Sequence, residues 1–368
     1  MNVERIETAG RFAELREEWN NLLERSASDC VFLTHEWLHT WWKHLADGRR
    51  LSILACREDG NLVGIMPVAV RDAQYTRMMP RALEFLGSGV IGSDYLDAIM
   101  LPGHEREVMR AFGDQLNQSN LMLHLSQLKR GSSAALELAE QLQRRRWTVA
   151  ETKINVCPFI SLAGLDWDGY LATRSSSQRY NFNRRLRQLM KGSEMRLECV
   201  QSPGEAQTGL DVLIALHRKR WGARGSSEAF QTDAVVAFHR EFVERAAGRG
   251  WLRLMILRLG NQPVAALYGL RYGERFYFYQ SGFDPAYSKQ SVGLVVMGLA
   301  IKAAIEEGVS EYDFLHGDEE YKFHWASGVR DLGRLELYPP HARGRIYKRA
   351  IDLNRAARQM AKRVLTKG

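Results

Sequence analysis

The sequence contains little cysteine and no long hydrophobic run. Its four cysteines, Cys30, Cys56, Cys157 and Cys199, form no C-x-x-C pair among 368 residues, so we expect neither a disulfide framework nor a structural zinc site. The longest uncharged, largely apolar stretch, residues 290–301, is too short to cross a bilayer, and the first ten residues lack the apolar segment of a signal peptide. These absences predict a cytoplasmic protein that binds no metal.

Charge is distributed unevenly along the chain. There are 51 Lys/Arg and 43 Asp/Glu, and residues 341–368 alone hold nine of the basic residues and one of the acids. The remainder is neutral overall, so the basic excess does not indicate a nucleic-acid-binding fold. In this tail, apolar residues recur at spacings of three and four, which predicts a basic amphipathic helix. Such a helix could contact an anionic membrane, bind nucleic acid or pack on the body of the protein.

The length of the chain predicts two domains. In the second half, alternating hydrophobicity predicts a meander of strands at 251–259, 264–272 and 276–282, then a helix at 293–307 and a strand at 312–315. The first half shows a similar order, with strands at 51–57, 62–70, 83–86, 95–101 and 121–125 and helices at 104–118 and 132–146. We therefore predict a mixed α/β fold with domains at residues 1–163 and 164–340 and the basic helix at 341–368.

The loop before the 293–307 helix is a candidate anion site. The first turn of a helix leaves backbone N–H groups without partners and carries partial positive charge, which together stabilise a phosphate. Gly293 would let a phosphate approach the backbone, and Gln290-x-x-Gly293 resembles the start of the pyrophosphate loop Q/R-x-x-G-x-G/A of GNAT acetyltransferases. Val295 departs from that motif, which has glycine or alanine there. The alternative is a core helix that Ser291 merely caps and in which Gly293 relieves packing.

Titratable side chains are concentrated directly after the strand at 312–315. His316, Asp318, Glu319 and Lys322 all follow it closely, at the edge where open α/β sheets bind ligands. Acyl transfer needs a group that takes a proton from the nucleophile, and a histidine or a carboxylate can do so. Tyr321 and Lys322 could orient an acceptor or protonate a departing thiolate. The alternative is a solvated loop without special chemistry.

Three segments of the second half resemble a single family. SSSQRYNFNRRLRQL (175–189), YQSGFDPAYSKQSVG (279–293) and YDFLHGDEEYKFHWA (312–326) are similar to the GNAT-related family of the cellulose-biosynthesis protein CelD, itself similar to the FemABX aminoacyltransferases. FLTHEWLHTWW and GSDYLDAIM extend the resemblance into the first half. It implies two tandem GNAT-like domains, acyl transfer from acyl-CoA and a role in exopolysaccharide or cell-envelope biosynthesis. Only the FemABX branch implies aminoacyl-tRNA as the donor.

These interpretations give a set of candidate site residues. An acid-free basic stretch at 174–191 contributes Arg179 and Arg184, and a glycine-rich turn contributes Asp94 and Tyr95, although a solvated helix face and an Asx-turn would explain the same patterns. The catalytic candidates are His316, Asp318, Glu319, Tyr279 and Lys322, the donor-binding candidates are Ser281, Gln290, Ser291, Val292, Gly293 and Leu294, and the acceptor-binding candidates are Arg179, Arg184, Asp94, Tyr95 and Tyr321.

The sequence thus predicts a cytoplasmic GNAT-type acyltransferase, associated peripherally with the inner membrane or with a polysaccharide synthase. It would move an acyl group, acetyl above all, from acyl-CoA to an amine or hydroxyl of a small molecule or glycan precursor, without a metal and without nucleic acid. Two alternatives remain open: a FemABX-like transferase that uses aminoacyl-tRNA, and a non-catalytic component of a polysaccharide-biosynthesis complex.

Overall fold

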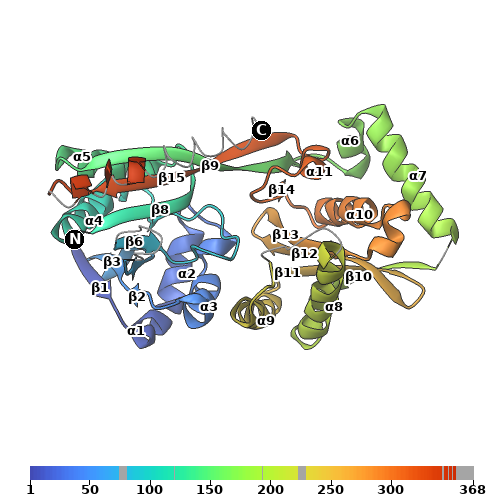
Figure 1. Ribbon diagram of the computed structural model, residues 1–368, viewed down its shortest axis with the longest axis horizontal. Helices are drawn as coiled ribbons and strands as arrows, with labels where there is room; N and C mark the ends of the chain where they lie inside the picture. Colours follow the sequence, from blue (N-terminus) through green and yellow to red (C-terminus); the bar gives the residue numbers. More distant parts are fainter. Residues whose placement is uncertain are drawn as a thin grey trace.

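The computed structural model describes residues 1–73, 81–119, 121–192, 194–222, 229–341, 344–346, 348–349 and 351–353. Figure 1 shows two lobes side by side, one formed mainly by the first half of the chain and the other by the second. Two long strands, β9 (Thr148–Ser161) and β15 (Gly328–Tyr338), run along one side of the molecule and connect the lobes. Both lobes mix helices with strands, so the predicted α/β class is confirmed.

The first lobe contains a small sheet and short strands that belong to a larger one. Its first helices begin at side-chain caps: Thr8 accepts a hydrogen bond from the Arg11 N–H, and Thr34 accepts one from Trp37. The elements are β1 (Asn2–Ile6), α1 (Ala9–Glu14), α2 (Arg16–Glu24), η1 (Val31–Leu33), α3 (His35–Leu45), β2 (Arg50–Leu51), β3 (Ile53–Glu58), β4 (Asn61–Met66), β5 (Val68–Arg71), β6 (Ala82–Phe85), β7 (Ile99–Met100), α4 (Glu105–Ser119), β8 (Met122–Lys129) and α5 (Ser133–Arg144).

The second lobe is a meander of antiparallel strands with helices on both faces. Its elements after β9 are α6 (Trp167–Ala172), α7 (Ser176–Gly192), β10 (Met195–Val200), α8 (Pro203–Gly222), α9 (Asp233–Gly248), β11 (Leu252–Leu259), β12 (Gln262–Tyr272), β13 (Arg275–Phe283), η3 (Pro285–Gln290), α10 (Val292–Glu306), β14 (Glu311–Asp313) and α11 (Glu320–Phe323), followed by β15.

Alternation along β11 explains how the helices are divided between the two faces. Leu252, Leu254 and Ile256 are buried in one cluster with α8 and α9, whereas Met255 and Leu257 are buried in a second cluster with α10. Successive strand residues point to opposite sides of a sheet, so α8 and α9 cover one face and α10 covers the other. Figure 1 shows this sandwich, with α10 and α7 on one side of the meander and α8 and α9 on the other.

One sheet passes through both lobes. Among the described residues, the strand order is β10-β11-β12-β13-β14-β9-β15-β8-β6-β5-β2, and a smaller sheet has the order β1-β3-β4-β7. The lobes also share core packing, because Trp37 of α3 lies edge-on to Phe238 and Phe242 of α9, with ring centroids 4.9 and 4.6 Å apart. The domain boundary at residues 163/164 stays a prediction. We note that β15, from beyond that boundary, pairs with β8 of the first lobe.

Several predicted elements are confirmed and others are wrong. The strands β11, β12, β13 and β14 and the helices α4, α5 and α10 lie where the sequence predicts them. The single strand predicted at 62–70 is instead β4 and β5, which lie in different sheets and are separated by Pro67, a residue without an N–H. The strand predicted at 51–57 is similarly divided between β2 and β3. Of the strand predicted at 95–101, only β7 forms, because the residues before it make contacts with the second lobe.

The predicted tail helix is described only in part. Residues 344–346, 348–349 and 351–353 are helical, with an ion pair of 2.7 Å between Lys348 and Asp352, and residues 354–368 lie outside the described part of the chain. No helix in the described ranges is long and apolar enough to cross a membrane.

Candidate active site

The strands β13 and β14 separate in the middle of the second lobe. They pair in parallel only from Arg275↔Glu311 to Tyr277↔Asp313, whereas β13 continues beside β12 as far as Phe283. Residues 278–283 therefore have one edge that no described strand pairs with. A bulge also interrupts β13, because Tyr268 and Gly269 face Gln280 and Phe278 and leave Tyr279 as the additional residue. An extended ligand could bind along this open edge by backbone hydrogen bonds.

The N-terminus of α10 lies at the end of this open edge. Leu294 and Val295 donate to the Ser291 carbonyl oxygen at 3.0 and 3.1 Å, but Ser291, in the left-handed region at φ 57°, provides no side-chain cap. The N–H groups of Val292 and Gly293 have no hydrogen-bond partner among the described residues. Partial positive charge at an uncapped helix start favours an anion there.

Packing does not by itself require glycine at position 293. A Cβ atom on Gly293 would meet only the ring of Phe283, at 3.4 Å, which is an ordinary contact. The interpretation of Gly293 as a residue that relieves crowding in the core is therefore not supported. Room beside the backbone is what a phosphate needs in order to approach the helix start.

A pocket of about 360 Å³ extends from this helix start toward α11, and we call it the α10 groove. Arg220 of α8 contributes a cation to its wall, where its Nη1 donates to Ser281 Oγ at 3.3 Å and its guanidinium lies 5.0 Å from the ring centroid of Phe283. The groove is lined by Arg220, Ser281, Gly282, Phe283, Ser288, Ser291, Val292, Gly293, Leu294, Val296, Met297, Tyr321, His324 and Trp325.

His316, after β14, forms a close pair with Asp94 of the first lobe. Its Nδ1 lies 2.8 and 3.0 Å from the two carboxylate oxygens, and its backbone N–H donates to Asp94 Oδ2 at 2.7 Å. Asp94 is fully buried, whereas the His316 side chain is 36% exposed, so Nδ1 is bound and the Nε2 edge is the part available to a substrate. The charge of Asp94 raises the pKa of His316 above its ordinary value, although burial opposes this.

The carboxylate–imidazole pair holds the His316 ring in one orientation. Gly92 permits the close approach, since a Cβ there would lie 3.0 Å from His316 Cε1. From the other side, the buried Lys322 donates to the His316 carbonyl oxygen at 2.6 Å and pairs with Glu319 at 2.9 Å. Both lobes therefore fix the position of one imidazole ring.

A second pocket, of about 370 Å³, lies between the lobes beside His316, and we call it the interlobe pocket. Its walls come from the 90–92 loop, α9, β13 and α11, and include His239, Tyr279, Gln280, His316, Glu319 and Lys322. Tyr321 lines both this pocket and the α10 groove. Burial raises the pKa of its phenol, which therefore keeps its proton at neutral pH. Two cavities thus meet at a protonated tyrosine.

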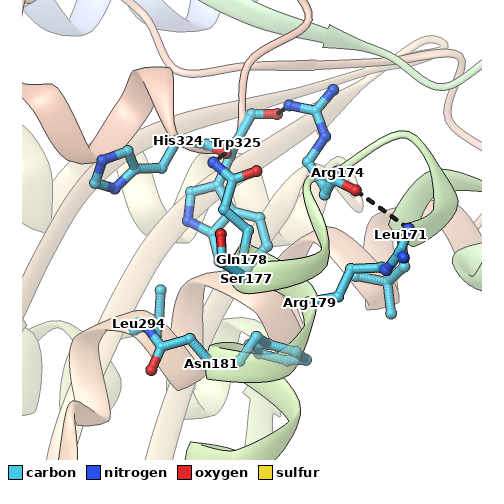
Figure 2. A pocket seen from close by; sticks show the side chains of 10 residues that line it. Leu171, Arg174, Ser177, Gln178, Arg179, Asn181, Leu294, His324 and Trp325 are labelled. Carbon is cyan, nitrogen blue, oxygen red and sulfur yellow. Dashed lines mark hydrogen bonds between the residues drawn. The ribbon is translucent and has the colours of Figure 1, made fainter.

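A third pocket, of about 330 Å³, continues the α10 groove toward α7 (Figure 2). It shares Leu294, His324 and Trp325 with the groove. Arg174 lines this third pocket and donates from Nη1 to the carbonyl oxygens of Trp325 and Ala326 at 3.0 and 2.9 Å. Figure 2 shows His324 and Arg179 on opposite sides of the pocket, with Gln178 between them, where it donates from Nε2 to the His324 carbonyl oxygen at 3.1 Å.

The structure brings most of the predicted residues to these pockets. Ser281, Ser291, Val292, Gly293 and Leu294 line the α10 groove, and Tyr279, His316, Glu319, Tyr321 and Lys322 line the interlobe pocket. Asp94 lies behind His316, and Arg179 lies at the pocket of Figure 2, where it donates to the Ala172 and Arg174 carbonyl oxygens.

Four predicted residues lie elsewhere. Asp318 and Gln290 are exposed and line neither pocket, and Arg184 is exposed on α7 with its guanidinium 5.8 Å from the centroid of the Tyr180 ring. Tyr95, at φ 60°, lines neither pocket, and its hydroxyl donates to Asp313 at 2.6 Å. Their predicted roles at the site remain untested, and this geometry gives none of them a direct place at the two pockets.

Sequence reasoning missed Arg220 and His239. Arg220 lies in the last turn of α8 with no motif around it, and His239 lies on the buried face of α9, where a histidine is commonly a core residue. The nearest available signal was the clustering of aromatic residues in β13, one of which, Tyr279, packs edge-on against His239 with ring centroids 5.2 Å apart.

A comparison with known families decides the class of the second lobe. Residues 176–323 match the family model described as "Acetyltransferase (GNAT) domain". This segment is a GNAT-type acetyltransferase domain. The predicted GNAT family is therefore confirmed. No protein with a curated description matches the sequence.

Solved structures show the same fold over most of the chain. FemX aligns with a TM-score of 0.62 at 10% identity, covering 91% of this chain and 97% of FemX. L-PGS from Bacillus licheniformis aligns with a TM-score of 0.55 at 12% identity, covering 88% and 92%. The C-terminal domain of a putative lysylphosphatidylglycerol synthetase from Agrobacterium fabrum aligns with a TM-score of 0.54 at 9% identity, covering 93% and 96%. The GNAT domain thus belongs to a larger FemX-like fold.

Among the described residues, no group of three or more His, Cys, Asp or Glu side chains could hold a metal ion. The four cysteines are free thiols, and Cys30, Cys56 and Cys157 are buried. The match to a GNAT domain suggests acyl transfer as the class of chemistry, and the described site holds a histidine, a tyrosine and an uncapped helix start that bear on it.

Proposed function

We propose that the protein transfers an acyl group, acetyl above all, from acyl-CoA in the α10 groove to an amine or hydroxyl of an acceptor in the interlobe pocket. The observation that carries this proposal is the uncapped start of α10. The free N–H groups of Val292 and Gly293, with Arg220 nearby, form a site for a pyrophosphate at one end of a groove whose other end reaches Tyr321. The acyl-CoA would extend along the open edge of β13, with its thioester near Tyr321.

The proposed chemistry is direct attack on the thioester. The acceptor nitrogen or oxygen forms a bond to the carbonyl carbon, the carbon–sulfur bond breaks, and His316 Nε2 takes the proton of the nucleophile. Tyr321 gives its proton to the departing thiolate and recovers one from solvent. Tyr279, Glu319 and Lys322 line the pocket where the acceptor binds, and Asp94 acts as a positioning residue that holds His316.

A charged substitution at residue 291 tests whether the start of α10 binds the pyrophosphate of the donor. Ser291→Asp places a carboxylate at the helix start, where it caps the free N–H groups and repels a pyrophosphate, so the Kd for acetyl-CoA should rise about tenfold or more. Ser291→Asn has the same shape without the charge, and both residues tolerate the left-handed backbone. Thermal stabilisation by acetyl-CoA, titrated for each variant, gives the Kd values.

The expected order is a large stabilisation of the wild type, a similar one for Ser291→Asn, and a much smaller one for Ser291→Asp. Equal stabilisation of the two variants would place the pyrophosphate elsewhere. If acetyl-CoA and free CoA do not stabilise the wild-type protein at all, the acyl-CoA donor is wrong.

One observation favours a second candidate, the aminoacyl-tRNA donor. Arg184, Arg187 and Lys191 are exposed along α7, which is joined to η3 by the hydrogen bond from Arg185 Nη1 to the Lys289 carbonyl oxygen at 2.9 Å. A basic face beside the groove would suit a polyanion. Salt-sensitive binding of tRNA without any response to CoA would favour this donor, and binding of neither would favour a non-catalytic component. The predicted roles in exopolysaccharide biosynthesis and at the inner membrane remain proposals.

A further inference from the structure

His239 is a buried histidine in the wall of the interlobe pocket that the proposed chemistry does not use. It lies on α9, opposite the 316–322 segment, and is 2% exposed. Aromatic rings surround it, with centroids 5.0 to 5.9 Å away for Phe230, Phe238, Tyr268 and Tyr279. Burial lowers the pKa of His239 to about 3, so the ring is neutral at physiological pH.

The polar atoms of this cluster are not satisfied. His239 Nδ1 and the Tyr268 hydroxyl are both buried and have no hydrogen-bond partner among the described residues. Native proteins leave few such groups, because a buried donor or acceptor without a partner costs free energy. Of the two residues, His239 lines the interlobe pocket, and a buried polar ring without a partner at a pocket wall indicates that a bound molecule completes its hydrogen bonding.

The charges that line the pocket are already neutralised in pairs. His316 is bound to Asp94, and Lys322 is bound to Glu319. Among the described lining residues, no further Lys, Arg, Asp or Glu side chain is present. A charged group at the α9 wall would therefore lose its hydration without gaining a counter-charge, whereas a neutral hydroxyl or amide would gain hydrogen bonds.

We propose that the acceptor carries, beside its nucleophile, an uncharged hydroxyl or amide that binds His239, and that His239 selects for this group. The inference rests on the proposed transferase function and specifies its substrate class. The nucleophile lies at the His316 and Tyr321 side of the pocket, and the neutral group lies at the α9 side. A site built around a hydrogen bond rejects analogues that lack the bonding group, because its own polar atoms are then left without partners.

Matched amines test this inference. Serinol carries two hydroxymethyl groups on its amine-bearing carbon, where 3-aminopentane carries two ethyl groups and 2-aminomalonate carries two carboxylates, so the three differ mainly in the group offered to His239. With acetyl-CoA as donor, kcat/KM for serinol should exceed that for either analogue by about tenfold or more. His239→Phe keeps an aromatic ring of similar size and should abolish the preference, chiefly through KM. His239→Gln keeps a neutral hydrogen-bonding group and should retain part of it.

Binding of acetyl-CoA is the control that shows whether each protein is folded and whether the proposed function holds. All three proteins should show the same thermal stabilisation by acetyl-CoA, since His239 does not line the α10 groove. Equal use of serinol and 3-aminopentane, no use of either by a protein that binds acetyl-CoA, or an unchanged preference in His239→Phe would overturn the inference. Loss of acetyl-CoA binding by the wild type would instead overturn the proposed function.

Discussion

Replacing His316 with alanine should lower kcat by about 10²- to 10⁴-fold, the range expected for loss of a general base. Asp94 holds Nδ1 of this ring and raises its pKa, which leaves the Nε2 edge to accept a proton from a nucleophile in the interlobe pocket. Acetyl-CoA binding should not change, since His316 does not line the α10 groove. His104→Ala, a substitution of a histidine just before α4 in the first lobe, is the matched control and should leave kcat unchanged.

The pH dependence of kcat/KM distinguishes a histidine that acts as a general base from one that only supports the structure. The base must be neutral to act, so kcat/KM should rise with pH through the pKa of His316 and level off above it. Asp94→Asn removes the charge that raises this pKa, so the acidic limb should move to lower pH while the plateau falls. A loss of activity in Asp94→Asn without any movement of the acidic limb, or a His316→Ala enzyme with normal kcat, would contradict the assignment.

Replacing Gly282 with alanine should lower the free energy of unfolding by about 3 kcal/mol, at the upper end of the usual cost of overpacking. A Cβ on Gly282 would lie 2.4 Å from the backbone nitrogen of His217 and 2.7 Å from the carbonyl carbon of Leu216. Because these atoms belong to the backbone of α8, no rotamer change can relieve the clash, and α8 would have to move away from β13. Gly282 also lines the α10 groove, so donor binding should weaken together with stability.

Gly204→Ala in the first turn of α8 is the control, because a Cβ there would meet nothing within 4 Å. In urea unfolding, the free energy of unfolding of Gly204→Ala should lie within about 0.5 kcal/mol of the wild-type value, whereas that of Gly282→Ala should be far lower. Similar midpoints for both variants would show that β13 and α8 are not packed as described.

The parts of the fold that could be predicted from the sequence depend on local patterns. Strands β11, β12 and β13 are apolar and aromatic-rich runs separated by turns at Gly260 and Gly273, both with positive φ, and α10 is followed by Gly308, also at positive φ. The start of α10 as a candidate anion site was accessible in the same way, since a loop, a glycine and an apolar helix follow one another in the chain. The absence of a side-chain cap from Ser291 is seen only in the structure.

The parts that could not be predicted depend on contacts between distant segments. Asp94 and His316 are 222 positions apart, and Tyr95 and Asp313 are 218 apart. Nothing in the glycine-rich turn at 92–95 indicates that one of its side chains orients the histidine of another lobe. Asp318 had the right neighbours in the sequence but is exposed, because the turn after β14, with Leu315 and Gly317 at positive φ, directs it away from the pocket.

A crystal structure of the protein with CoA tests the central claim most directly. The account predicts pyrophosphate oxygens within hydrogen-bonding distance of the N–H groups of Val292 and Gly293, the pantetheine along the open edge of β13, and the thiol beside Tyr321. A CoA molecule bound with its phosphates away from the start of α10, or its thiol far from the interlobe pocket, would contradict the account.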